Sequence, residues 1–158
     1  WVYYWAIWFH LPADTVGQVA FHFNVPDKLD YGCRLLRKVS AAKGRAVVLG
    51  SRQMLDELDR HLWTFSSTDF LPHCWVDDSA LVAKAPIVLT TDLQQALFWD
   101  FLVNFGGALS GPVDKFDRVI EIVSTDPEDR LQARERWRAY SDKGLLLTRH
   151  DLGGVVEK

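Results

Sequence analysis

The chain has 158 residues, of which 48% are hydrophobic and 25% are charged, and its formal net charge is −3. These totals are typical of a single domain with a sizeable core, and they exclude a disordered or fibrous chain. The negative net charge also argues against binding DNA over a broad surface, because such binding needs an extended basic face.

The first 17 residues are rich in aromatic side chains, and we treat them as an N-terminal extension of unknown role beside one domain at 18–158. Their apolar run is too short to cross a membrane and lacks the basic region of a signal peptide. Two isolated cysteines, Cys33 and Cys74, are typical of a reducing compartment. We therefore expect a cytoplasmic protein without a membrane contact.

Strands and helices are predicted to alternate from residue 18 onward. Apolar and polar residues alternate at 18–25, which indicates a strand, and 29–43 place apolar residues on one helical face before Gly44 ends the helix. The apolar run at 45–51 indicates a buried strand, and Ser51 is placed to cap the helix that follows.

The second half of the chain continues this alternation. Further buried strands are predicted at 86–92 and 117–124. The last helix is expected to begin with Asp126 as its cap and Pro127 in its first position, and to end at Gly144. Together these elements predict an α/β fold with a mostly parallel sheet flanked by helices.

The turn after the first strand is where an open α/β sheet often binds a phosphate group. It reads NVPDKLD at 24–30, and neither of the glycine-rich phosphate-binding motifs occurs in the sequence. A nucleotide-hydrolysing enzyme is therefore not expected.

His73, Cys74, Asp77 and Asp78 could be imagined as a nucleophile, a base and an orienting group. Adjacent residues on a strand point to opposite faces, however, so His73 and Cys74 are not expected to contact each other through their side chains. We expect a buried thiol beside a surface histidine. The histidines also lack metal-ligand spacing, so neither a metal nor a cofactor is predicted.

The segment LWTFSSTDFLPHCW at 62–75 places a polar turn between two clusters of large apolar side chains. If these side chains are exposed, they form the kind of aromatic patch that protein interfaces use. If they point inward, they belong to the core. The pattern alone leaves both interpretations open.

The segment ARERWRAY at 133–140 is basic and aromatic. At about 100° per residue, a helix gathers part of it on one arc, with Ala133, Tyr140 and the stem of Arg136 on another side. The residues that share the arc are Arg130, Arg134, Trp137, Arg138 and Ser141.

Three interpretations compete for this arc: a solvated helix face, a nucleic-acid contact, and a pocket for an acidic peptide that carries an apolar residue. Arginine binds phosphate and carboxylate equally well, so the residue type does not decide. A groove for single-stranded DNA needs basic residues over several nucleotides, which this acidic chain lacks elsewhere. The compact arc is better suited to a short anionic segment.

Several motifs resemble the chi subunit family of the bacterial DNA polymerase III clamp-loader assembly. They are LWTFSSTDFLPH, RVIEIVS and DRLQARERWRAYSDKG, and the resemblance runs from about residue 19 to residue 151. It implies a fold similar to mononucleotide-binding α/β proteins without their phosphate loop. It also implies no catalysis and no cofactor.

The resemblance further implies a replisome adaptor, associated with the nucleoid, that has two protein partners and no direct specific contact with DNA. One partner is the psi subunit, whose contact would involve Trp63 and Phe70. The other is the acidic C-terminal tail of the single-stranded DNA-binding protein, whose pocket would involve Arg134, Trp137 and Arg138 with Val123 in its apolar floor.

Two other hypotheses remain at this stage. One is an enzyme on a nucleotide-like α/β scaffold, nucleotide-dependent or hydrolytic, that uses strand ends near His73 or Asp92. The other is direct binding of single-stranded DNA through the arginine arc, which would show a steep dependence on salt concentration.

Overall fold

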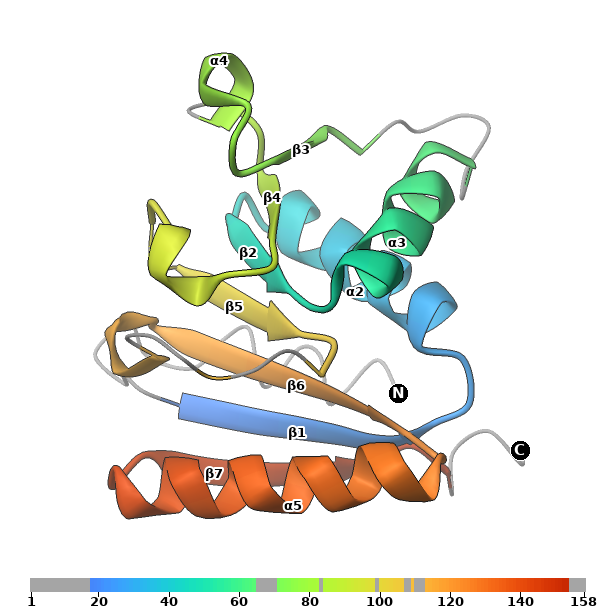
Figure 1. Ribbon diagram of the computed structural model, residues 1–158, viewed down its shortest axis with the longest axis vertical. Helices are drawn as coiled ribbons and strands as arrows, with labels where there is room; N and C mark the ends of the chain where they lie inside the picture. The colour runs from blue at the N-terminus through green and yellow to red at the C-terminus, as the bar shows by residue number, and fades with distance from the viewer. Residues whose placement is uncertain are drawn as a thin grey trace.

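The computed structural model describes residues 18–64, 71–82, 84–98, 100–106, 109 and 113–153. Within these residues the chain forms one sheet of seven strands in the order β3-β4-β2-β5-β6-β1-β7, and every neighbouring pair is parallel (Figure 1). The strands are β1 (Gln18–Val25), β2 (Ala46–Leu49), β3 (His73–Trp75), β4 (Ile87–Thr90), β5 (Phe101–Asn104), β6 (Arg118–Ser124) and β7 (Leu146–Asp151). This architecture confirms the predicted α/β fold.

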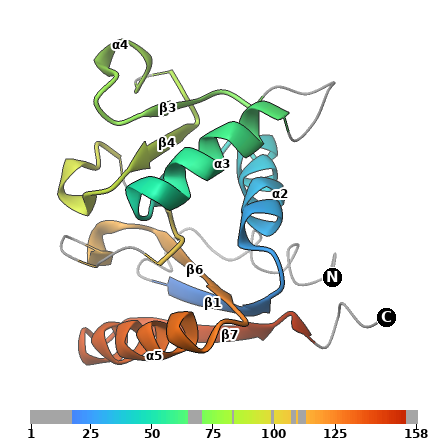
Figure 2. The same ribbon diagram turned by 45° about the vertical axis from the view of Figure 1, so that its right-hand side comes forward.

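Helices cover both faces of the sheet. They are α2 (Lys28–Ala41), α3 (Arg52–Thr64), the single turn α4 (Ser79–Val82) and α5 (Pro127–Asp142), with 3-10 turns η1 (Leu93–Gln95) and η2 (Val113–Lys115). Helices α2 and α3 lie together on one side, whereas α5 runs along β1 and β7 on the other (Figure 2). In the part of the chain that the structure describes, no helix is long and apolar enough to span a membrane.

The core consists of two apolar clusters, one on each face of the sheet. Alternate residues of β2 enter different clusters: Ala46 and Val48 face α2 and α3, whereas Val47 and Leu49 face the opposite side. All four are fully buried. This two-sided burial explains why the strand is an unbroken apolar run in the sequence.

The helix ends agree with the sequence in part. Ser51 caps α3 as predicted, because its Oγ accepts a hydrogen bond from the Met54 amide at 3.2 Å, and Pro127 occupies the first turn of α5. The prediction that Gly44 ends the first helix is inexact, because Lys43 is the residue with the left-handed φ of 61°. Asp126 precedes α5 but makes no side-chain cap hydrogen bond.

A buried carboxylate fastens α5 to the sheet. Glu121 of β6 is fully buried, and its Oε1 accepts a hydrogen bond from Arg136 Nε at 2.8 Å. Its Oε2 accepts from the Tyr140 hydroxyl at 2.6 Å and from Asn104 Nδ2 at 2.9 Å. A buried carboxylate without such partners is strongly destabilising, so these contacts fix where α5 lies on β6.

A second buried polar cluster joins β1, α2 and β7. The His22 ring is hydrogen-bonded through Nδ1 to the Tyr31 hydroxyl and meets the His150 ring edge-on at 5.0 Å between centroids. Burial, with a smaller effect from the charge of His150, lowers the pKa of His22 from 6.5 to about 3. Burial also lowers the pKa of His150.

Replacing Tyr140 with phenylalanine removes one hydrogen-bond donor from the buried Glu121 carboxylate. We expect the Tyr140→Phe variant to lose about 1.5 to 3 kcal/mol of unfolding free energy, as is usual for hydrogen bonds to charged groups. Urea unfolding measures this loss of unfolding free energy. The matched control is Tyr31→Phe, whose hydroxyl partner His22 is neutral and whose cost should be about 0.5 to 1.5 kcal/mol. A smaller loss for Tyr140→Phe than for the control would contradict the importance of this network.

The buried histidines predict a loss of stability in mild acid. His22 stays neutral in the folded chain, whereas the unfolded chain takes up a proton below about pH 6.5, so the free energy of unfolding falls as the pH is lowered from about 6.5 toward 3. Urea midpoints at several pH values between these limits measure the slope. His22→Gln should flatten it, and the exposed control His61→Gln should not. An unchanged slope in His22→Gln would refute the assignment.

Candidate functional site

A hollow of about 300 Å³ lies between α5 and the strands β6, β1 and β7. Strands supply one side of it and the helix supplies the other. Its lining residues are Phe21, Phe23, Val123, Arg130, Ala133, Arg134, Trp137, Arg138 and Arg149.

The floor of the hollow is apolar. Phe21, Val123 and Ala133 are almost completely buried there. The Phe21 ring lies 5.0 Å from the half-buried Trp137 ring, between centroids. Phe21 and Phe23 reach the same face because side chains two apart on a strand point the same way. An apolar side chain placed in the hollow would therefore contact rings and a valine.

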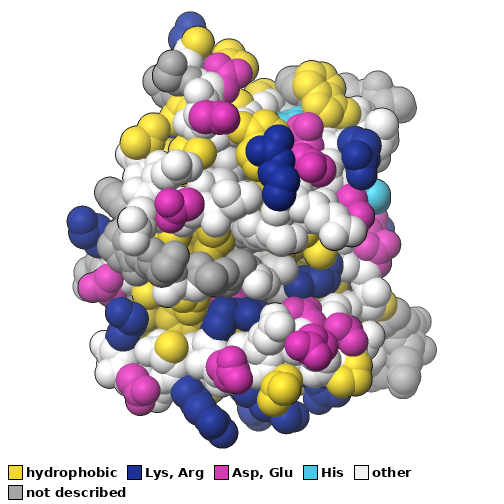
Figure 3. All heavy atoms as spheres, viewed as in Figure 1, with side chains coloured by type: hydrophobic (Ala, Val, Ile, Leu, Met, Phe, Trp, Pro, Cys, Tyr) yellow, Lys and Arg dark blue, Asp and Glu magenta, His cyan; other side chains and the backbone are white. Residues whose placement is uncertain are grey.

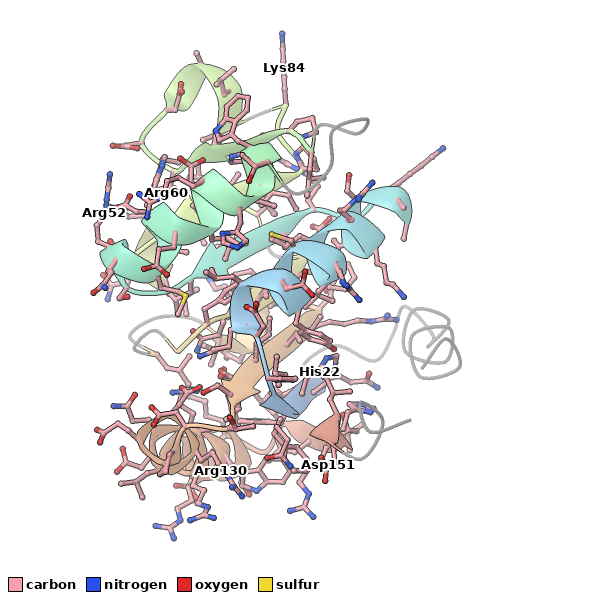
Figure 4. The ribbon with its side chains drawn as sticks, turned by 90° about the vertical axis from the view of Figure 1, so that its right-hand side faces the viewer. His22, Arg52, Arg60, Lys84, Arg130 and Asp151 are labelled. Carbon is pink, nitrogen blue, oxygen red and sulfur yellow. The ribbon has the colours of Figure 1, made fainter. Side chains whose placement is uncertain are left out.

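The rim of the hollow is cationic. Arg130, Arg134 and Arg138 recur every four residues along α5, so they form a row that rises about 12 Å, while Arg149 approaches from β7. Among the described residues that line the hollow, none is acidic. Figure 3 shows Lys and Arg side chains along the lower rim of the molecule over α5, and Figure 4 shows Arg130 on this helix.

The rim arginines Arg134, Arg138 and Arg149 have no ion pair with any carboxylate in the described part of the chain. Arg136, by contrast, points to the sheet and pairs with Glu121 at 2.8 Å. The helix therefore uses one arginine for structure and presents the others to solvent.

This combination of groups is suited to a small amphipathic anion. Guanidinium groups form two parallel hydrogen bonds with a carboxylate or phosphate. The volume is at the lower end of the range for ligand pockets, about 300 to 1,000 Å³, so it would take one or two side chains. The site therefore fits a short acidic segment with an apolar residue.

The sequence-predicted residues Val123, Arg134, Trp137 and Arg138 are all brought together in this hollow. Ala133, which the helical projection placed on another side, also lines it. Sequence reasoning missed Phe21, Phe23 and Arg149. The alternation at 18–25 could have indicated the two phenylalanines, whereas Arg149 belongs to a strand that was not predicted.

The second predicted contact is described only in part. Trp63 lies in the last turn of α3 with 60% of its surface exposed, and its ring meets the His73 ring edge-on at 5.4 Å. Phe70 lies outside the described residues. Leu62 and Leu71 are buried, so this segment supplies both an exposed indole and core side chains.

The imagined set of His73, Cys74, Asp77 and Asp78 does not assemble. Cys74 belongs to the cluster on the other face of the sheet, and burial raises the pKa of its thiol. His73 is not a surface residue as expected, because Trp63 covers it and its Nε2 is paired with Asp59 at 2.6 Å. The other candidate, Asp92, caps η1 by accepting a hydrogen bond from the Gln94 amide at 3.0 Å.

The carboxyl edge of the sheet between β1 and β6 is closed by an ion pair. The loops after these strands lead to helices on opposite faces of the sheet. The crevice between two such loops is the place where α/β proteins usually bind ligands. Here Lys28 Nζ lies 2.9 Å from Asp129 Oδ2 and donates to the Phe105 carbonyl at 2.8 Å. Burial alone would raise the pKa of Asp129, but hydrogen bonds from the Ser124 amide and Lys28 hold it below its ordinary value.

The portion of the chain covered by the structure contains no group of three or more His, Cys, Asp or Glu side chains that could hold a metal ion.

A family model and a curated bacterial relative indicate the same family. Residues 16–148 match the family model described as DNA polymerase III chi subunit, HolC. The chain is also 32% identical over 127 residues to the DNA polymerase III subunit chi of Pseudomonas aeruginosa strain PAO1, an alignment that covers 79% of this chain and 87% of that protein.

One similar solved structure is a variant S. cerevisiae Dbp5 C-terminal domain bound to a Gle1 variant and IP6. The alignment covers 95% of this chain and 84% of the Dbp5 chain. Its TM-score is 0.30 and its sequence identity is 14%. These values are too low to bear on function. The matches to the family model and to the bacterial relative show that the chain belongs to the DNA polymerase III chi subunit family.

Proposed function

We propose that this DNA polymerase III subunit is a non-catalytic adaptor that joins two proteins in the cytoplasmic replisome. Its hollow on α5 binds the acidic C-terminal tail of the single-stranded DNA-binding protein. The surface around Trp63 and Phe70 binds the psi subunit, which connects the chain to the clamp loader.

The observation that carries the proposal is the hollow itself. Its apolar floor and its rim of arginines lie in one small volume, and the lining residues that the structure describes include no acidic side chain to compete for those arginines. A peptide with carboxylates and one apolar residue satisfies both parts at once. A phosphate backbone would satisfy the arginines but would leave Phe21 and Val123 unused.

Two further observations support an adaptor rather than an enzyme. The usual ligand crevice of an α/β sheet holds the Lys28–Asp129 pair, and the candidate catalytic side chains His73 and Cys74 lie on opposite faces of the sheet. The exposed indole of Trp63 is a typical anchor for a protein partner. It lies on α3, on the opposite side of the sheet from α5, so both partners can bind together.

The tail site predicts that a labelled acidic peptide with an apolar C-terminal residue binds the protein and that Arg138→Ala weakens this binding. The loss should be about 5- to 30-fold, equivalent to 1 to 2 kcal/mol for one charge-assisted contact. Removing the apolar residue from the peptide should weaken binding to the unaltered protein as well. Fluorescence anisotropy measures all three affinities.

The control for charge is Arg60→Ala, which removes an exposed arginine on α3, far from α5 (Figure 4). It should leave the peptide affinity unchanged. Equal affinities for both peptides and both variants would disprove the tail site. Tight binding of a single-stranded oligonucleotide that Arg138→Ala abolishes would favour a nucleic-acid contact instead.

The second contact predicts that Trp63→Ala abolishes binding of the psi subunit and leaves the tail-peptide affinity unchanged. The indole is 60% exposed, so its loss should cost little stability. Pull-down with psi and peptide titration provide the two measurements, and Leu97→Ala is the control because Leu97 is also exposed, at 66%. A collapsed thermal transition in Trp63→Ala would show that the indole is structural.

A further inference from the structure

Arg149 lies on the sheet side of the hollow, opposite the arginine row of α5. It pairs in register with Phe21 of the neighbouring strand, and residues paired in this way share a face of the sheet. Its guanidinium carbon also lies 6.0 Å from the centroid of the Phe23 ring. Arg149 therefore adjoins the apolar floor, one residue beyond the segment that matches the family model.

The guanidinium group of Arg149 is available to a ligand. Arg149 is exposed, and no carboxylate among the described residues pairs with it. Asp151 is the acidic residue two positions further along β7, but its Oδ1 already accepts hydrogen bonds from Asn24 Nδ2 at 2.9 Å and from the Gly153 amide at 3.0 Å.

The arginines on the helix side of the hollow extend over a greater length than the single arginine on the sheet side. The row from Arg130 to Arg138 extends about 12 Å along α5, which corresponds to about four residues of an extended peptide at 3.3 Å each. Arg149 instead lies beside the apolar floor and does not extend along the helix. If the last residue of a chain places its side chain on Phe21 and Val123, its α-carboxylate must lie at the edge of that floor, because only the Cα separates the two groups.

We propose that Arg149 is a specificity-determining residue that binds the terminal α-carboxylate of the acidic tail, while Arg130, Arg134 and Arg138 bind the carboxylates that precede it. This inference rests on the proposed tail site and adds a requirement to it. The site recognises a chain end, so an acidic segment inside a longer chain binds more weakly.

The test is a double-mutant cycle between the protein and the peptide. Acidic peptides with a free and with an amidated C-terminus are titrated against the unaltered protein, Arg149→Gln and the control Arg60→Gln. Glutamine keeps part of the aliphatic stem of Arg149 and a polar end group, and it removes the charge. We expect amidation and Arg149→Gln each to weaken binding roughly 5- to 10-fold, and amidation to have little further effect in Arg149→Gln.

The outcomes separate this inference from the proposed function. If Arg138→Ala weakens binding but Arg149→Gln does not, the tail site stands and the role of Arg149 is wrong. If Arg149→Gln weakens both peptides equally and amidation still matters in it, Arg149 supplies only general positive charge and the inference fails. If neither peptide binds the unaltered protein, the proposed function fails. A thermal transition of Arg149→Gln equal to that of Arg60→Gln shows that β7 is intact.

Discussion

The buried charge of Glu121 determines where the last helix lies, and the candidate site depends on that position. Its carboxylate can remain in the core only with Arg136, Tyr140 and Asn104 around it. Two of these partners belong to α5, so the helix is held over β6 at one rotation. In that rotation Trp137 faces Phe21, and the arginines at every fourth position line the rim of the hollow. One helix thus has an inner arginine that stabilises the fold and outer arginines that remain available to a ligand.

The same fold shows why the proposed binding site lies away from the usual place. In many α/β proteins a glycine-rich turn at the carboxyl edge of the sheet binds a phosphate group. In this chain the side chains of Lys28 and Asp129 occupy that edge and neutralise each other. Within the described residues, the arginines Arg134, Arg138 and Arg149, which have no carboxylate partner, lie instead at the hollow between α5 and one face of the sheet. The structure therefore favours recognition of an extended anionic chain over enclosure of a nucleotide.

Much of the fold and part of the site could be predicted from local pattern. Buried strands are continuous apolar runs, and the arc of Arg134, Trp137 and Arg138 follows from helical periodicity alone. The edge strand β7 was not predicted, because its apolar part is confined to Leu146 and Leu147 and the four residues after them are polar, and Arg149 was missed with it. The exposure of Trp63 and the burial of His73 beneath it could not be predicted from the sequence either, because each depends on a contact between α3 and β3.

We propose above that a negatively charged chain end binds between α5 and β7. This binding is tested most directly by following the indole N–H signals of Trp137 and Trp63 in one NMR spectrum while an acidic peptide with an apolar C-terminal residue is added. We expect the Trp137 signal to shift and saturate while the Trp63 signal stays in place. A Trp137 signal that does not move when binding is saturated, or a shift confined to Trp63, would rule out binding in the hollow.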